Sequence, residues 1–177
     1  MDAVKKLYND IPQPVKRFLV RAAIFFVIWR LLYYFVFEPT KIPDQQLIDI
    51  VIIGTKWVLS FVYDSLAWVG DVIIINGKPT LQVAKDCNGL ELIVVYLGFL
   101  VCWPTNPKRF WTFALIGPVI ITLLNILRCS ALGIMFYNDH KLADFAHHYF
   151  FKLIIYAVTF WLWVKYSKKQ KTTTNAK

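Results

Sequence analysis

The sequence predicts an all-α integral membrane protein: a polytopic helical bundle of four transmembrane helices, with an amphipathic interfacial helix and a short extracytoplasmic β-hairpin. Of its 177 residues, 58% are hydrophobic and 17% aromatic, and the mean hydropathy is +0.50. That composition is too apolar for an ordinary soluble domain. Several uncharged runs also approach the roughly 20 residues that cross about 30 Å of hydrocarbon. We expect one transmembrane domain, residues 1–166, followed by a polar cytoplasmic tail, residues 167–177.

The first span is predicted over residues 18–37. Pro12 and Pro14 precede this apolar run, and Glu38-Pro39 ends it. Arg30 lies well inside the run, where an ionisable side chain is expensive and usually functional. The sequence assigns no role to Arg30.

Residues 45–69 form a second apolar stretch of a different kind. Asp49, Lys56, Ser60 and Asp64 recur at helical spacing and would share one face, which predicts an amphipathic helix. Asn76-Gly77 then lies between two β-branched runs and predicts a hairpin over 71–86. Further spans are expected at about 88–103, 110–127 and 149–165.

Basic residues set the expected orientation. They flank the apolar segments, so the net charge of +9 favours membrane lipids over nucleic acid as the partner. They cluster before the first span, in the 104–110 turn and after the last span, which places all three regions in the cytoplasm. Both termini on one side require an even number of crossings. We therefore expect four spans with the 45–69 helix in the outer interface, and a tilted fifth span over 45–69 is the alternative.

This orientation brings chemically active side chains to one membrane face. Cys87 opens the 88–103 span, Arg128 closes the 110–127 span, and His147-His148 open the last span. Successive spans alternate in direction, so all of these residues should meet at the outer face.

The set suits acyl transfer. Histidine or arginine favours the reactive thiolate of a nearby cysteine. A guanidinium can stabilise an oxyanion, and an imidazole can protonate a leaving amine, so no cofactor is required. Asn125, one turn before Arg128, and Glu91, one turn after Cys87, lie on the same side and support the set.

Other interpretations remain open at this point. Cys87 could simply pack, and Arg128 could extend to the headgroups. Cys87, His140, His147 and His148 could hold zinc, but the chain lacks HExxH and CxxC spacing, so no metal is predicted. Cys87 and Cys129 could form a redox pair, but here too a CxxC motif is missing.

Three segments resemble the exosortase/archaeosortase family of membrane transpeptidases: DCNGLELIVVYLGFL, NILRCSALGI and DFAHHYFFKLIIYAVTFWLWV. Cys87-Asn88-Gly89 matches the family's cysteine, small or polar residue and glycine at the start of a span. Asn125 and Arg128 match its Asn-x-x-Arg, and a histidine opens the following span. The resemblance covers about 80–165 and is that of a small single-domain bacterial form. It implies a catalytic domain with Cys87 as nucleophile, Arg128 as transition-state stabiliser and His147 or His148 as acid/base.

Family members commonly have glycine four residues after the histidine, where this chain has Phe151 or Lys152. The alignment therefore does not choose between the two histidines, although we favour His147.

The resemblance also implies the substrate and the location. Members cleave secreted proteins that carry a C-terminal sorting signal, composed of a short motif, a hydrophobic helix and a basic tail. They act from the bacterial inner membrane, and here the site would face the extracytoplasmic side. The acyl-enzyme would be a thioester on Cys87, resolved by an acceptor or by water, with residues 45–86 covering the site. The alternatives are a non-enzymatic envelope-assembly protein and a thiol-redox protein.

Overall fold

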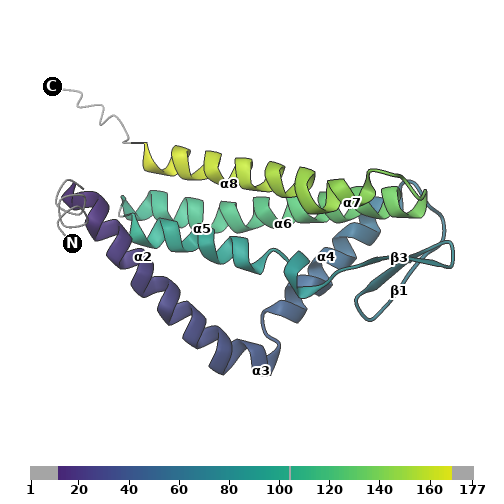
Figure 1. The fold of residues 1–177 in the computed structure, drawn as a ribbon, viewed down its shortest axis with the longest axis horizontal. Helices are drawn as coiled ribbons and strands as arrows, with labels where there is room; N and C mark the ends of the chain where they lie inside the picture. Colours follow the sequence, from purple (N-terminus) through teal and green to yellow (C-terminus); the bar gives the residue numbers. More distant parts are fainter. Residues whose placement is uncertain (1–11, 104, 169–177) are drawn as a thin grey trace, which may run out of the picture.

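The computed structural model describes residues 12–103 and 105–168 of the chain (Figure 1). The helices are α2 (Gln13–Leu32), α3 (Glu38–Thr40), α4 (Asp44–Leu59), α5 (Leu90–Cys102), α6 (Pro107–Tyr137), α7 (Ala143–Phe145) and α8 (Phe151–Ser167). Two π-helical turns join consecutive helices, η1 (Tyr33–Phe37) between α2 and α3 and η3 (Ala146–Phe150) between α7 and α8, and one 3₁₀ turn, η2 (Lys85–Cys87), precedes α5. The strands are β1 (Leu66–Val69), β2 (Val72–Ile75) and β3 (Lys78–Gln82).

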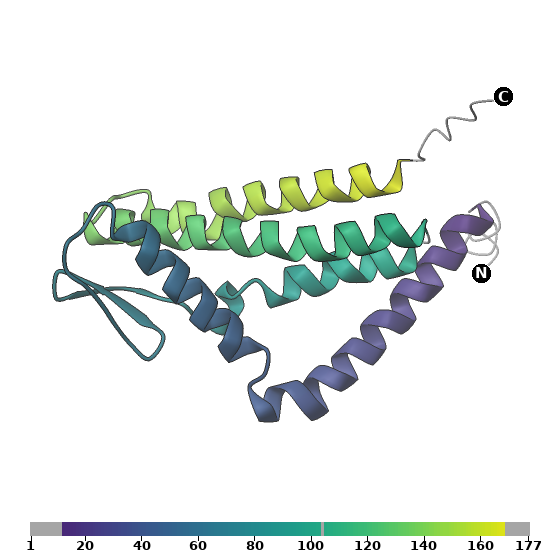
Figure 2. The same ribbon diagram turned by 180° about the vertical axis from the view of Figure 1, so that it is seen from behind.

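Helices α5, α6 and α8 run side by side, and α2 diverges from them toward α3 (Figures 1 and 2). An aromatic cluster joins the C-terminal parts of α5 and α8, where the Phe99 ring stacks on Trp163 with centroids 4.7 Å apart. Beside it, the Tyr166 hydroxyl donates to the Leu100 and Trp103 carbonyls, each at 3.1 Å. The bundle is therefore closed at this end.

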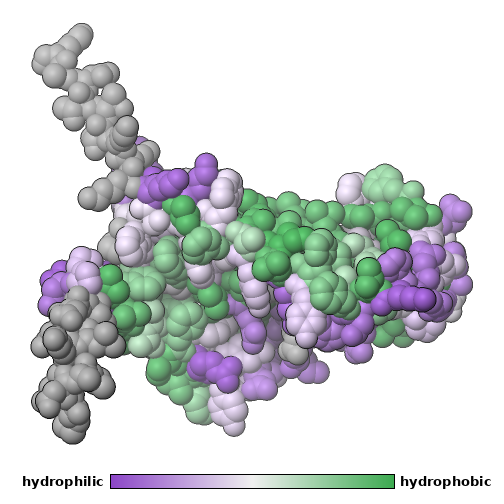
Figure 3. Space-filling view, turned by 45° about the horizontal axis from the view of Figure 1, so that its top comes forward, coloured by the Kyte–Doolittle hydropathy of each residue, from purple (hydrophilic) through white to green (hydrophobic). Residues whose placement is uncertain are grey.

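Two helices of the described chain are long and apolar enough to cross a membrane, Gln13–Thr40 and Pro107–Tyr137. Helix α5 is apolar but has only 13 residues. The predicted count of four spans, or five, is thus not confirmed and stays a prediction. Hydrophobic side chains cover much of the elongated face in Figure 3, between more hydrophilic ends. That distribution suits a protein whose middle contacts lipid.

The second apolar stretch differs from its prediction. Its helix, α4, ends at Leu59, and residues 66–69 are strand β1, so the predicted helix over 45–69 is too long. Asp64 therefore lies beyond the helix, and the predicted polar stripe ends at Ser60, the C-cap. Helix α4 buries Val51 and Ile52 against α6 and leaves Ile53 and Trp57 exposed.

A three-stranded antiparallel sheet, β1-β2-β3, replaces the predicted two-stranded hairpin. The predicted turn is present, because Asn76 and Gly77 both have positive φ, +48° and +79°, as a tight hairpin turn requires. A second turn at Gly70 (φ +57°) adds β1. Ile73 and Ile75 of β2 belong to the core that the sheet shares with α4 and α6.

The bundle helices also have different limits from those predicted. Helix α6 continues to Tyr137, so Arg128 lies inside it instead of closing it. The reason is that residues after Arg128 stay apolar and pack on α4 and the sheet, as Leu132 does. The last helical segment begins at Ala143, so His147 and His148 lie in η3 and do not open it. Helix α8 ends at Ser167, and residues 169–177 lie outside the described part, so the cytoplasmic tail over 167–177 stays a prediction.

Candidate active site

Cys87 lies at the end of the turn η2, immediately before α5. Asn88 and Gly89 connect the two, and Gly89 adopts a left-handed φ of +83° that few residues other than glycine accept. The Asn88 side-chain oxygen accepts a hydrogen bond from the Leu90 backbone N–H at 2.8 Å, which satisfies a free donor at the start of α5. The segment 87–89 thus fixes where the cysteine stands relative to the helix. We call it the nucleophile turn, after the role that the resemblance implies for Cys87.

Two other elements bring side chains to this cysteine. The Cys87 Sγ lies 3.8 Å from His147 Nε2, which comes from η3. It lies at the same distance, 3.8 Å, from Arg128 Nη2 of α6. The convergence expected from alternating spans is therefore present, although Arg128 and His147 lie within their helical segments rather than at the ends.

Arg128 is nearly removed from solvent, with 6% of its surface exposed. Its Nε finds no hydrogen-bond partner among the residues that the structure describes. A buried guanidinium whose hydrogen-bonding groups are not all satisfied favours a negative charge beside it, because burial has removed the water that would otherwise solvate it. The Cys87 thiolate is one such charge, and an oxyanion formed on a bound acyl group is another.

His147 precedes the span predicted at 149–165. Burial lowers the pKa of His147 below its ordinary value, and the positive charge of Arg128 lowers the pKa further. The imidazole is therefore neutral at neutral pH, when one ring nitrogen is free to accept a proton. Its Nε2 faces the thiol and is placed to do so.

The two adjacent histidines differ in their surroundings. His148 is exposed, and its Nδ1 lies 3.2 Å from the Asp144 carboxylate on the outside of the helix. His147 is half-buried and faces Cys87. The geometry thus separates two neighbours that the sequence pattern could not distinguish.

The predicted supporting residues fall in different places. Asn125 is buried, and its Nδ2 donates a hydrogen bond to the Cys87 backbone carbonyl. Gly89 packs close to Asn125, since a Cβ built on Gly89 would lie 3.7 Å from the Asn125 Nδ2. Glu91 is exposed and lines the cavities on either side of the nucleophile turn.

A cavity of about 530 Å³ lies between α5, α6 and α8 and reaches Arg128 and Asn125. Its polar end is lined by Lys85, Asn88 and Lys152, and its other walls are mostly apolar. We call it the lateral groove. The aromatic contact of Phe99 with Trp163 closes the bundle beyond its apolar end. The apolar walls include Leu92, Val95, Ile121, Ile155, Tyr156, Phe160 and Trp163.

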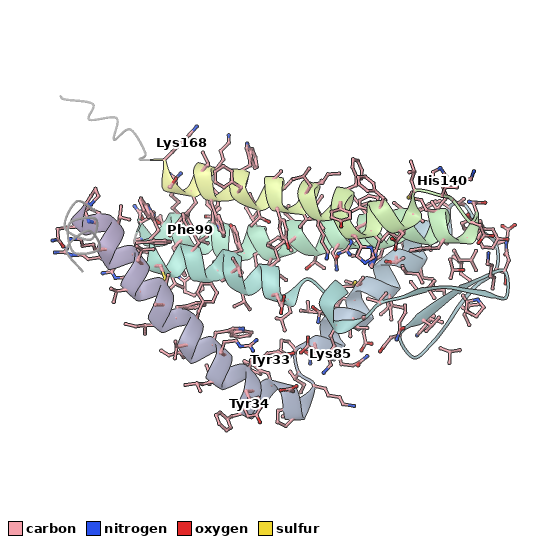
Figure 4. All side chains as sticks on the ribbon, in the orientation of Figure 1. Tyr33, Tyr34, Lys85, Phe99, His140 and Lys168 are labelled. Carbon is pink, nitrogen blue, oxygen red and sulfur yellow. The ribbon has the colours of Figure 1, made fainter. Side chains whose placement is uncertain are left out.

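A second, smaller cavity of about 130 Å³ lies between α2 and the start of α5. Arg30 lines it together with Tyr33, Glu38 and Asp44. Figure 4 shows Tyr33 and Lys85 in this region of the molecule. The cavity locates Arg30, for which the sequence offered no role. The sequence analysis did not single out Asp44 or Tyr33, because no local motif connects these residues with Cys87.

The structure gives less support to the two alternative sites, the zinc site and the redox pair. In residues 12–103 and 105–168, no group of three or more His, Cys, Asp or Glu side chains is arranged to hold a metal, and His140 lies at the far end of the bundle (Figure 4). Cys129 is a free, buried cysteine in the apolar core with Leu132. Neither the zinc set nor a disulfide between Cys87 and Cys129 is formed.

Comparison with protein families matches residues 16–165 to the transmembrane exosortase family, Exosortase EpsH. The match covers most of the chain and extends well upstream of the three motifs, into the first span. No curated protein and no solved structure matches the chain.

Proposed function

Because the chain belongs to the transmembrane exosortase family, we propose that it is a membrane cysteine transpeptidase or protease with Cys87, Arg128 and His147 as its catalytic residues. The observation that carries the proposal is the position of the Cys87 Sγ, 3.8 Å from both Arg128 Nη2 and His147 Nε2. These groups come from three separate elements, and each has a distinct task in acyl transfer.

The proposed reaction begins with proton transfer from the Cys87 thiol to neutral His147. The thiolate attacks the scissile carbonyl carbon, and Arg128 stabilises the resulting oxyanion. The tetrahedral adduct collapses, the carbon–nitrogen bond breaks, and protonated His147 gives its proton to the departing amine. A thioester remains on Cys87. An acceptor amine or water then attacks it while His147 takes the attacking group's proton and returns it to the leaving thiolate.

The lateral groove suits the hydrophobic segment of a C-terminal sorting signal. It is apolar along the paired helices α5 and α8 and polar where it meets Arg128 and Asn125. A substrate helix seated there would place the peptide just before it beside the nucleophile turn. Secreted proteins with such signals are therefore the proposed substrates.

The depth of the site supports an extracytoplasmic location in the bacterial inner membrane. Arg109 lies at one end of α6, where it donates to the Lys165 carbonyl, and both residues belong to the predicted cytoplasmic side. Arg128 is about 28 Å farther along the helix at 1.5 Å per residue, which is close to the thickness of the hydrocarbon core. If Arg109 marks the inner boundary, Cys87 is at the outer one.

Paired cysteine substitutions test the proposal. The Cys87→Ser variant should insert normally but leave secreted sorting-signal proteins uncleaved, as measured by mass spectrometry of their C-termini. Cys129→Ser is the matched control and should cleave normally. Normal cleavage by Cys87→Ser would favour the envelope-assembly alternative, and equal failure of both variants would favour the thiol-redox alternative.

A further inference from the structure

The nucleophile turn is held from two sides. On one side, Asn125 of α6 donates to the Cys87 carbonyl. On the other, Asn88 donates from Nδ2 to the Asp44 Oδ1 at 2.6 Å, while its own oxygen accepts from Leu90. The Asn88 side chain is 1% exposed. Its amide therefore links the start of α5 to the start of α4.

Asp44 is the buried centre of this second contact. It is 3% exposed, and its other oxygen accepts a hydrogen bond from the Tyr33 hydroxyl at 2.8 Å. Burying a carboxylate is costly unless it is fully hydrogen-bonded, and here both oxygens are used. Tyr33 belongs to η1, at the outer end of the first span. One carboxylate thus connects the first span, α4 and the nucleophile turn.

We infer that Asp44 is a positioning residue for Cys87, acting through Asn88, which rests on the proposed function of Cys87 as nucleophile. Within the described residues, the Asp44 carboxylate hydrogen-bonds to Tyr33 and Asn88 and not to the Cys87 sulfur, Arg128 or His147. Its role is to fix the amide of Asn88, and hence the turn that aims the sulfur between Arg128 and His147. A carboxylate suits this position because it only accepts hydrogen bonds, and both of its partners, the Tyr33 hydroxyl and the Asn88 amide, are donors.

The donor and acceptor roles can be reversed to test this inference. Asn88→Asp keeps an oxygen for the Leu90 N–H, but it removes the donor to Asp44 and places two carboxylates together. Asp44→Asn alone keeps an oxygen for Asn88, and its new N–H₂ can donate to the Tyr33 oxygen. In the double variant, the new Asn donates to the new Asp, and the contact re-forms with reversed polarity. Asp49→Asn, the same substitution at an exposed residue of α4, is the control.

The measurement is the rate of Cys87 alkylation by iodoacetamide in the full-length protein, located by mass spectrometry. The ratio of the rates at pH 7 and pH 10 separates activation from exposure, because thiols react as thiolates and nearly all are ionised at pH 10. Asn88→Asp should lower this ratio about tenfold or more, since an unassisted thiol with a pKa of about 8.5 is only a few per cent ionised at pH 7. The double variant should recover most of the loss, and Asp49→Asn should match the parent.

Two results would overturn the inference. One is an Asn88→Asp ratio equal to that of the parent. The other is a double variant as impaired as Asn88→Asp alone, which is what a purely structural defect in the turn would produce. A different result bears on the proposed function itself: if Cys87 of the parent reacts no faster at pH 7 than Cys87 of Arg128→Met, the nucleophile is not activated, and both proposals fail.

Discussion

Replacing Arg128 by Met should separate catalysis from stability. The Arg128 side chain is 6% exposed, its Nη2 lies 3.8 Å from the Cys87 sulfur, and its Nε lacks a partner within the described residues. An incompletely satisfied buried charge lowers the stability of a fold. A methionine of similar length removes that penalty and fills most of the space. We therefore expect the melting temperature of Arg128→Met to equal or exceed that of the parent.

The rate of substrate cleavage, in contrast to the melting temperature, should fall in Arg128→Met. Losing one preorganised donor to a developing oxyanion typically costs about 10²–10³ in kcat, or about 2.7–4 kcal/mol of transition-state stabilisation. Among the residues that the structure describes, Arg128 is the only Lys or Arg that donates to the Cys87 sulfur. The full penalty should therefore appear in the rate of substrate cleavage.

The assay is cleavage of a sorting-signal protein by the reconstituted enzyme, with thermal unfolding of the same preparation followed in parallel. Arg109→Met is the matched control, because Arg109 lies near the start of the same helix, far from Cys87, and donates to the Lys165 carbonyl. It should retain the parental rate. An Arg128→Met enzyme that cleaves at close to the parental rate would refute the oxyanion role. A large loss of melting temperature would refute the reasoning about the buried charge.

Three further outcomes follow from the geometry. Cleavage should fall on acidification with an inflection below pH 6.5, because burial and Arg128 lower the pKa of His147 and only neutral imidazole accepts the thiol proton; a pH–rate profile inflecting above 6.5 contradicts this. Gly89→Ala (φ +83°) should lower the free energy of unfolding, measured with denaturant, by about 1–2 kcal/mol and should also slow substrate cleavage. Gly70→Ala (φ +57°) should lower the free energy of unfolding but leave the cleavage rate unchanged. Val95→Trp should raise KM by filling the lateral groove, unlike the exposed Val101→Trp; equal kinetics would argue against the groove.

The meeting of Cys87, Arg128 and a histidine could be predicted from the sequence. Antiparallel spans alternate in direction, so residues near corresponding ends reach one face. The turn at Asn76-Gly77 could also be predicted, because both residues favour positive φ. These features depend on local propensity and on chain direction, which a single sequence contains.

The remaining features depend on packing that hydropathy does not distinguish. Residues after Arg128 are apolar whether they face lipid or the sheet, so the extension of α6 to Tyr137 was missed. His147 and His148 are chemically identical neighbours, and only the path of η3 points one of them at Cys87. The contact of Asp44 with Asn88 joins two segments far apart in the chain, and no local pattern marks it.

The central claim is that Cys87 is an activated nucleophile at the outer membrane face, and labelling with a membrane-impermeant maleimide tests it most directly. In intact spheroplasts, the account predicts that Cys87 is labelled from outside while the buried Cys102 and Cys129 are spared. It also predicts that labelling at neutral pH slows in Arg128→Met and His147→Ala. A Cys87 that is unreactive, or that is labelled only after the membrane is opened, would contradict it.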